Sequence, residues 1–390
     1  MLIYPTLKMT PVQGLIGFGG GATGNLVRGS GGASWLSDET FETASAFGNK
    51  GPTDAQFTSA YSSRDWYTAG DYYFYNGILF LKIPATATYN YTIQGAYGGR
   101  GDGSNMDISE AGGKPALFSG TITLTKDKWL GIAVGQRGVD GTYVGSSGGG
   151  GGGGTFVFYL DSSASTLNNS EVESNSCTAL LVAGGGNGAN WDSWNTETAA
   201  AKLPSTYNSG VGDPISASYY TNAYGRGAFG GSFLYTAYWS TDTSAYTPYT
   251  QYSSYNTAYT WRSGAPLLNS SNRITTNSLK GGMDFQAGGI SYTNKNYSTS
   301  GAGGDGGFGG GGGSLYEGGG GGGYWGGRAY VENQYNSTYA YGSQSMANST
   351  YATVSSEGHG TASLGLRTTK YSQNTTAPNS ALQGSFRLYV

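Results

Sequence analysis

The sequence predicts an all-β protein, a β-sandwich packed on a bundle of polyglycine-II helices, with long aromatic loops and almost no α-helix. Three observations indicate this fold. Short runs of β-branched and aromatic residues alternate with turn residues along the first half of the chain. No segment shows the apolar periodicity of a helix. Long glycine tracts lie beside several of the apolar runs.

The predicted strands are short runs with alternating or continuous hydrophobicity. Residues 89–96 read YNYTIQGA, which is the alternation of a strand with one buried face. The other predicted strands are 77–83, 120–125, 129–134, 155–160 and 179–183. Many short strands separated by turn residues are typical of a sandwich or a barrel.

Glycine supplies 71 of the 390 residues, much of it in tracts at 148–154, 184–186, 309–313 and 318–323. An isolated tract would be a flexible linker. These tracts instead adjoin strands or aromatic residues, so both ends of each would be fixed. A buried oligoglycine segment can pair its amides as a three-fold, polyproline-II-type helix that bonds sideways to parallel neighbours. Seven such residues would extend about 22 Å.

The composition excludes several classes of function. Charged residues make up 11% of the chain and the net charge is −3, so we expect no nucleic-acid binding. No apolar run approaches the roughly 20 residues that span a bilayer, so we expect no membrane insertion. Pro5, Lys8 and Pro11 interrupt the apolar opening, which predicts no signal peptide. Cys177 is the single cysteine, so no disulfide forms within one chain.

The sequence predicts a protein that is not an enzyme, with no catalytic residues, no cofactor and no metal site. His359 is the only histidine, so a triad or a histidine metal site has one candidate base. No G-x-S-x-G or phosphate-binding G-x-x-x-x-G-K-[ST] motif is present. Met106 stands where a calcium loop starting at Asp102 needs an oxygen ligand. Asp65 and Asp71 are a conceivable carboxylate pair, but nothing in the sequence marks them.

A collinear series of segments between residues 51 and 366 resembles the extracellular glycine-rich domain of the anaplastic lymphoma kinase family of receptors. Its blocks include KIPAT from Lys82, GAYGG from Gly95, LTKDKWLGIAVGQRG from Leu124, LVAGGG from Leu181 and EGHG from Glu357. The resemblance implies a jelly-roll-like β-sandwich joined to a bundle of polyglycine-II helices. It implies no kinase, because the kinase motifs and the cysteines of that domain are missing.

A second resemblance, in composition, is to the tip adhesins of T-even-like bacteriophage tail fibres, which carry polyglycine-II bundles beneath variable aromatic loops. It implies that residues 1–31, with GLIGFGGGATG, dock on a fibre or another virion protein. We therefore divide the chain into a docking segment at 1–50, a glycine-rich domain at 51–366, and a C-terminal tail with a final strand at 367–390. Tyrosine-rich loops are expected at about 190–300 and 330–352.

These aromatic loops are the predicted binding site. Four tyrosines recur every third residue, which places them along one edge of a three-fold helix. Tyrosine, serine and asparagine together are typical of binding loops. The same residues could instead cover the glycine bundle or join copies of the chain, and the aromatic stretch at 61–75 is expected in the core or at the sandwich edge. The candidate binding residues are Tyr246, Tyr249, Tyr252, Tyr255, Tyr259, Trp261, Tyr335, Tyr339 and Tyr341.

Taken together, these features predict a non-enzymatic adhesin on the virion surface, a tail-fibre or tip protein for host attachment. Its receptor would be a host surface glycan or an outer-membrane protein, bound through the tyrosine-rich loops. The alternative is a structural subunit of an extracellular fibre or matrix, in which those loops join copies of the chain. A soluble relative of the receptor ectodomain is disfavoured because signal peptide and disulfides are missing.

Overall fold

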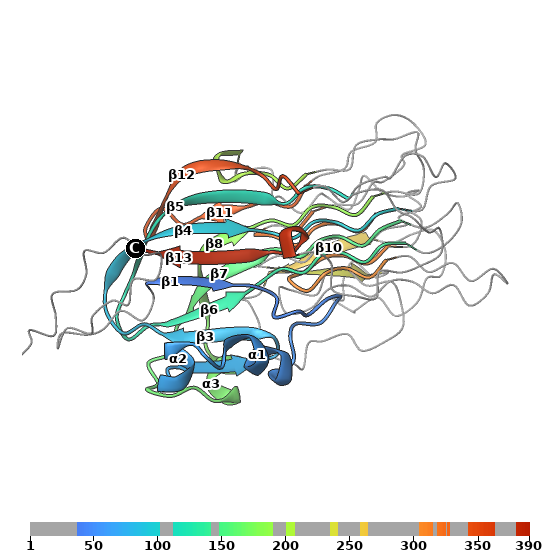
Figure 1. Ribbon diagram of the computed structural model, residues 1–390. Helices are drawn as coiled ribbons and strands as arrows, with labels where there is room; N and C mark the ends of the chain where they lie inside the picture. Colours follow the sequence, from blue (N-terminus) through green and yellow to red (C-terminus); the bar gives the residue numbers. More distant parts are fainter. Residues whose placement is uncertain are drawn as a thin grey trace, which may run out of the picture.

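Two antiparallel sheets stack as a sandwich, and glycine-rich segments extend from one end of it (Figure 1). The architecture confirms the predicted all-β sandwich. The structure is a computed structural model that describes residues 37–101, 112–141, 148–189, 200–206, 235–240, 258–263, 304–314, 318–324, 326–327, 342–362 and 380–390.

The first sheet has one buried and one solvent-facing side. On β4, Tyr89, Tyr91 and Ile93 point into the core, whereas Thr88 is exposed on the opposite face. This alternation follows from the two-residue period of a strand. The five strands, in spatial order, are β1 (Asp38–Phe41), β13 (Ser385–Tyr389), β4 (Ala87–Gln94), β5 (Ala116–Leu124) and β12 (Ala352–His359).

The second sheet is covered on both sides, and its central strands are buried at every position. Val157 and Tyr159 pack towards the first sheet, while Phe156 and Phe158 join a second core cluster with Phe308. A strand that is covered on both faces has a continuous apolar sequence. The six strands, in spatial order, are β11 (Met346–Ala347), β8 (Cys177–Ala183), β7 (Thr155–Leu160), β6 (Trp129–Ala133), β3 (Ile78–Lys82) and β2 (Tyr72–Tyr75).

Three short helices occur in the described part of the chain: α1 (Asp54–Tyr61), α2 (Asp65–Ala69) and α3 (Asn169–Ser174). A capping box between Thr53 and Gln56 starts α1, and Gly70, at φ +75°, ends α2. These helices are too short for an apolar period to be visible in the sequence. The stretch at 61–75, expected in the core or at the sandwich edge, contributes to both: Tyr61 and Trp66 are buried in the core, and β2 is the edge strand of the second sheet.

The sandwich extends beyond the boundaries expected at residues 51 and 366. β1 lies within the segment assigned to docking, and it pairs with the final strand β13, which in turn pairs with β4. Residues 38–41 and 385–389 therefore belong to the first sheet. The pairing joins strands near the two ends of the described residues, which no local pattern indicates.

A separate two-stranded antiparallel sheet is formed by β9 (Tyr235–Ser240) and β10 (Ala258–Ser263). Both strands fall within the predicted tyrosine-rich region. Binding residues were predicted in this region, and the structure adds the backbone register between the two strands.

Candidate functional site

Glycine-rich segments continue several strands in the same direction, past one end of the sandwich (Figure 1). Residues 95–101 follow β4, 135–141 follow β6, and 184–189 follow β8. Residues 148–154 lead into β7. Together with 304–314 and 318–324 they form what we call the glycine bundle.

The bundle is held by backbone hydrogen bonds between segments that are distant in sequence. Amides 149–154 donate in turn to segments 184–189, 135–141 and 309–312, and then repeat that order, at 2.8–2.9 Å. Carbonyls 148–153 accept from 96–99, 304–307 and 319–322, at 2.7–3.0 Å. Segment 148–154 is thus surrounded by six stretches of backbone. The segment to which its amides donate repeats every three residues.

The segments pack so closely that a side chain has no room. A Cβ on Gly152 would lie 2.2 Å from the Ala96 carbonyl oxygen, and one on Gly186 would lie 1.7 Å from that of Gly113. Both distances are far below van der Waals contact. Glycine is required here by the approach of neighbouring backbone.

The far end of the bundle is a layer of hydrogen-bonded backbone. Gly141 N donates to Arg100 O at 2.9 Å, and Gly304 N donates to Gly148 O at 3.0 Å. Ser314 Oγ donates to Gly148 O at 2.6 Å. Segments 102–111, 142–147, 190–199 and 315–317 each follow directly on a residue of this end.

A buried ion pair ties two bundle segments together near this end. Arg137 donates to Asp140, and their side chains are only 2% and 7% exposed. Asp140 Oδ1 also accepts the Arg100 amide at 2.8 Å. The carboxylate therefore links 135–141 to 95–101. Removing one member would leave its partner charged in a dry environment, which is far more costly than losing an exposed pair.

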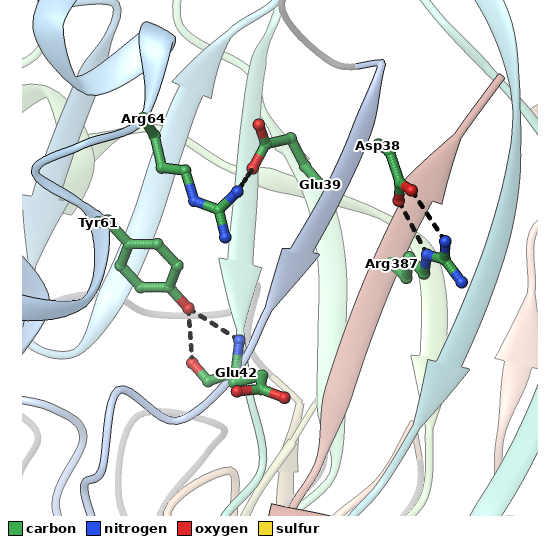
Figure 2. A network of polar contacts seen from close by, with 6 residues as sticks. All are labelled: Asp38, Glu39, Glu42, Tyr61, Arg64 and Arg387. Carbon is green, nitrogen blue, oxygen red and sulfur yellow. Dashed lines mark hydrogen bonds and ion pairs between the residues drawn. The ribbon is translucent and has the colours of Figure 1, made fainter. Parts of the chain in front are cut away.

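At the opposite end of the sandwich, polar contacts fix the first described strand (Figure 2). Asp38 accepts two hydrogen bonds of 2.9 Å from Arg387 on β13. On the other side of β1, Arg64 lies 3.5 Å from Glu39. Val390 N donates to Ser37 O at 3.1 Å. The chain before residue 37 therefore joins the sandwich at the end away from the bundle.

Tyr61 completes this network from α1. Its hydroxyl donates to Glu42 O at 3.0 Å and accepts from Glu42 N at 2.8 Å. Burial raises the pKa of Tyr61 to about 12, and it also raises the pKa of the Glu39 carboxyl. The hydrogen bond from Arg387 lowers the pKa of Asp38. These contacts of Asp38, Glu39 and Tyr61 have a structural role, because they hold β1 between β13 and the helices.

The structure places two of the predicted binding residues. Tyr259 and Trp261 lie on β10, in register with Trp239 and Ala237 of β9. Trp239 was not singled out from the sequence, although the run Tyr238-Trp239-Ser240 is a signal for it. The other candidates lie outside the described residues: Tyr246, Tyr249, Tyr252, Tyr255, Tyr335, Tyr339 and Tyr341.

The single histidine and the single cysteine are engaged in the fold. His359, the last residue of β12, donates from Nε2 to Ala201 O at 2.8 Å. Burial raises the pKa of the Cys177 thiol, which keeps it protonated. Among the described residues, no three of His, Cys, Asp and Glu gather in a way that could hold a metal ion.

No helix in the described ranges is long and apolar enough to cross a membrane. No family model matches this chain. The resemblances to the receptor domain and to the tip adhesins stay predictions.

Proposed function

We propose that this protein is a non-enzymatic adhesin of a virion surface, a tail-fibre or tip protein that presents aromatic loops to a host. The observation that supports this best is the polarity of the molecule. Ser37, the first described residue, lies at one end, next to Val390, whereas segments 102–111, 142–147 and 190–199 follow in sequence on residues at the far end of the glycine bundle. An attachment segment and a recognition surface would thus lie at opposite ends.

We also infer that the bundle segments are polyglycine-II helices. Donation that repeats every three residues has the period of that helix. The eight residues of β4 span about 26 Å. Seven bundle residues add about 22 Å in this conformation. The two ends would then be separated by about 50 Å of continuous hydrogen-bonded structure, which suits a rigid display platform.

The chemistry of the loops favours recognition of a host surface glycan or outer-membrane protein. The segment 236–262 combines tyrosine and tryptophan with serine and threonine. Aromatic rings give rigid contact area, and hydroxyls adapt their hydrogen bonds to a ligand. Residues 1–31 would dock on a fibre or another virion protein.

Electron microscopy of the native particle, with one tag after Val390 and another inserted in 190–199, tests this proposal. We expect the C-terminal tag close to the particle body and the inserted tag at the free tip. The purified chain should also inhibit adsorption of the particle to its host. Removal of residues 1–36 should abolish incorporation into the particle but not this inhibition.

The competing role is a fibre or matrix subunit whose aromatic loops join copies of the chain. Sedimentation velocity of the purified chain separates the two roles. Ordered self-association that is lost when 241–257 is replaced by a glycine-serine linker would refute the adhesin. A chain that stays unassociated and blocks adsorption would refute the fibre subunit.

A further inference from the structure

Two tyrosine rings stack against each other where helix α2 meets β2, an edge strand of the second sheet. Tyr67 is the third residue of α2, and Tyr72 is the first residue of β2. Gly70, at φ +75°, ends the helix between them. The ring centroids lie 4.6 Å apart, and the ring planes are inclined by 20°. Carbon atoms of the two rings are therefore in van der Waals contact.

Neighbouring side chains fix this stack. The Phe57 ring lies 6.0 Å from that of Tyr67 and 5.6 Å from that of Tyr72. Trp66 makes a T-shaped contact with Tyr72, with ring centroids 5.8 Å apart. The hydroxyls of Thr58 and Tyr67 are hydrogen-bonded at 3.2 Å. Both tyrosines pack against the core, and each keeps a solvent-accessible part. The pair is thus held in one geometry that a reagent in solution can reach.

The two phenols differ in how readily they release a proton. Hydrogen bonds with Thr58 and Tyr72 lower the pKa of the Tyr67 phenol. Burial raises the pKa of Tyr72 to about 12. A phenol that loses an electron also loses its proton, so a lower pKa makes the oxidation easier. Tyr67 is therefore the ring that we expect to be oxidised first, with Tyr72 in contact beside it.

A second pair of tyrosines provides a contrast. The rings of Tyr159 and Tyr351 have centroids 5.7 Å apart, but their planes meet at 87°. Tyr159 is only 3% exposed, and its hydroxyl accepts a hydrogen bond from the Thr125 amide at 2.8 Å. A T-shaped contact directs the edge of one ring at the face of the other. This pair is therefore poorly accessible to a dissolved oxidant and poorly aligned for joining two edge carbons.

We propose that Tyr67 and Tyr72 are an oxidative coupling site, which hydrogen peroxide and a haem peroxidase convert to an intramolecular dityrosine. Each phenol loses one electron and one proton, which gives a tyrosyl radical whose unpaired electron is shared with the carbons ortho to the oxygen. A carbon–carbon bond forms between one ortho carbon of each ring, and the hydrogens of these two carbons move to the phenolic oxygens. In total two electrons and two protons leave the chain, and one hydrogen peroxide is reduced to two water molecules.

The new bond would tie α2 to the edge of the sandwich. Among the described strands, β2 pairs with β3 alone, so one side of β2 has no neighbouring strand to hold it. A covalent link to α2 would keep the helix on this strand when the hydrogen bonds around it open. The inference is independent of the proposed adhesin function, because it concerns a bond within one chain.

Peroxidase treatment of the dilute, folded full chain, followed by trypsin digestion and tandem mass spectrometry, tests the proposal. Residues 65–82 form one tryptic peptide that carries both rings. We expect this peptide to lose the mass of two hydrogen atoms and to give no fragment ions from cleavage between residues 67 and 72. Tyr67→Phe and Tyr72→Phe should each abolish that product, although both keep a ring in the stack. Tyr73→Phe is the matched control and should keep the product, because the Tyr73 hydroxyl donates to Asn169 on α3 instead.

Three results would overturn the proposal: no loss of hydrogen from peptide 65–82, an equally frequent link between Tyr159 and Tyr351, or undiminished product in Tyr67→Phe. The same treatment of the urea-unfolded chain measures the contribution of the fold. We expect the link between residues 67 and 72 to decline strongly there, and an equal yield in folded and unfolded chains would also overturn the proposal. Circular dichroism checks that each variant folds, and the map of the wild-type chain decides the question if a variant does not.

Discussion

Substitution of Gly152 by alanine tests whether the bundle depends on backbone contact. Gly152 lies in the central segment, where its amide donates to Gly186 O at 2.8 Å and its carbonyl accepts from Gly322 N at 2.9 Å. The new Cβ would lie 2.2 Å from Ala96 O and 2.6 Å from Tyr97 O. The neighbouring backbone must retreat by about 1 Å to restore van der Waals contact.

A displacement of this size breaks the hydrogen bonds that share these atoms. Ala96 donates to Gly153 O at 2.9 Å and accepts from Gly186 N at 3.0 Å, and neither bond survives a lengthening of about 1 Å. With the Gly152 amide included, about three buried N–H donors lose their carbonyl acceptors, and each loss costs about 1–3 kcal/mol. The gain from a stiffer unfolded chain, about 0.4–1 kcal/mol, is smaller. We expect Gly152→Ala to lose about 2–8 kcal/mol, a large share of a domain's stability.

Chemical denaturation followed by circular dichroism measures this loss. Gly358→Ala is the matched control, because no atom lies within 4 Å of its Cβ position on β12. The control should change the free energy of unfolding by less than about 1 kcal/mol. Equal stability of the two variants would refute the reasoning, since the bundle would then tolerate side chains at its centre.

Three further results follow from the buried charges and phenols. Asp140→Asn leaves Arg137 buried without its counter-ion, so we expect a loss of about 3–5 kcal/mol in the same denaturation assay. Asp38→Asn, whose exposed pair with Arg387 is half accessible, should cost less than about 1 kcal/mol, and similar losses at the two sites would contradict this account. Burial raises the pKa of Tyr61 to about 12 in the folded state, whereas the phenol of the unfolded chain has a pKa of about 10. The unfolded chain therefore loses this proton first, and the free energy of unfolding should fall as the pH rises from about 10 towards 12. Tyr61→Phe should flatten this fall by about 2–3 kcal/mol, as followed by circular dichroism against pH, and an unchanged slope would argue against a buried phenol. Burial raises the pKa of Glu39, so the folded state binds this proton more tightly than the unfolded chain. The wild type should therefore lose stability relative to Glu39→Gln as the pH rises above about 4.5. A wild type that gains stability relative to Glu39→Gln over this range would show that the attraction of Arg64 outweighs burial.

Strand positions could be predicted wherever the environment of a strand leaves a local pattern. The alternation at 89–96 located β4, because one face of that strand is buried. The continuous apolar run at 155–160 coincides with β7, because both of its faces are covered. The helices α1 and α2 were missed since each is too short to show a period. The link between Arg137 and Asp140 had a signal in its spacing of three residues, but segment 135–141 was not among the predicted glycine tracts, so the link was missed.

The candidate site was only partly predictable. The aromatic content of 236–262 is visible in the sequence, and the prediction that this segment binds a ligand rests on that content alone. The pairing of Trp239 with Tyr259 is not, because the strands are separated by a long segment and their register depends on how that segment brings them together.

The sequence by itself determined an all-β chain with strands at defined places and glycine tracts joined to them. Only the tertiary structure decided that β1 pairs with β13 across nearly the whole chain, and which glycine segments surround 148–154. The physical reason is that glycine has no side chain, so a glycine tract carries no pattern that identifies its neighbours. Its partners are set by the strands that hold its ends, whose order in the two sheets is a property of the folded core.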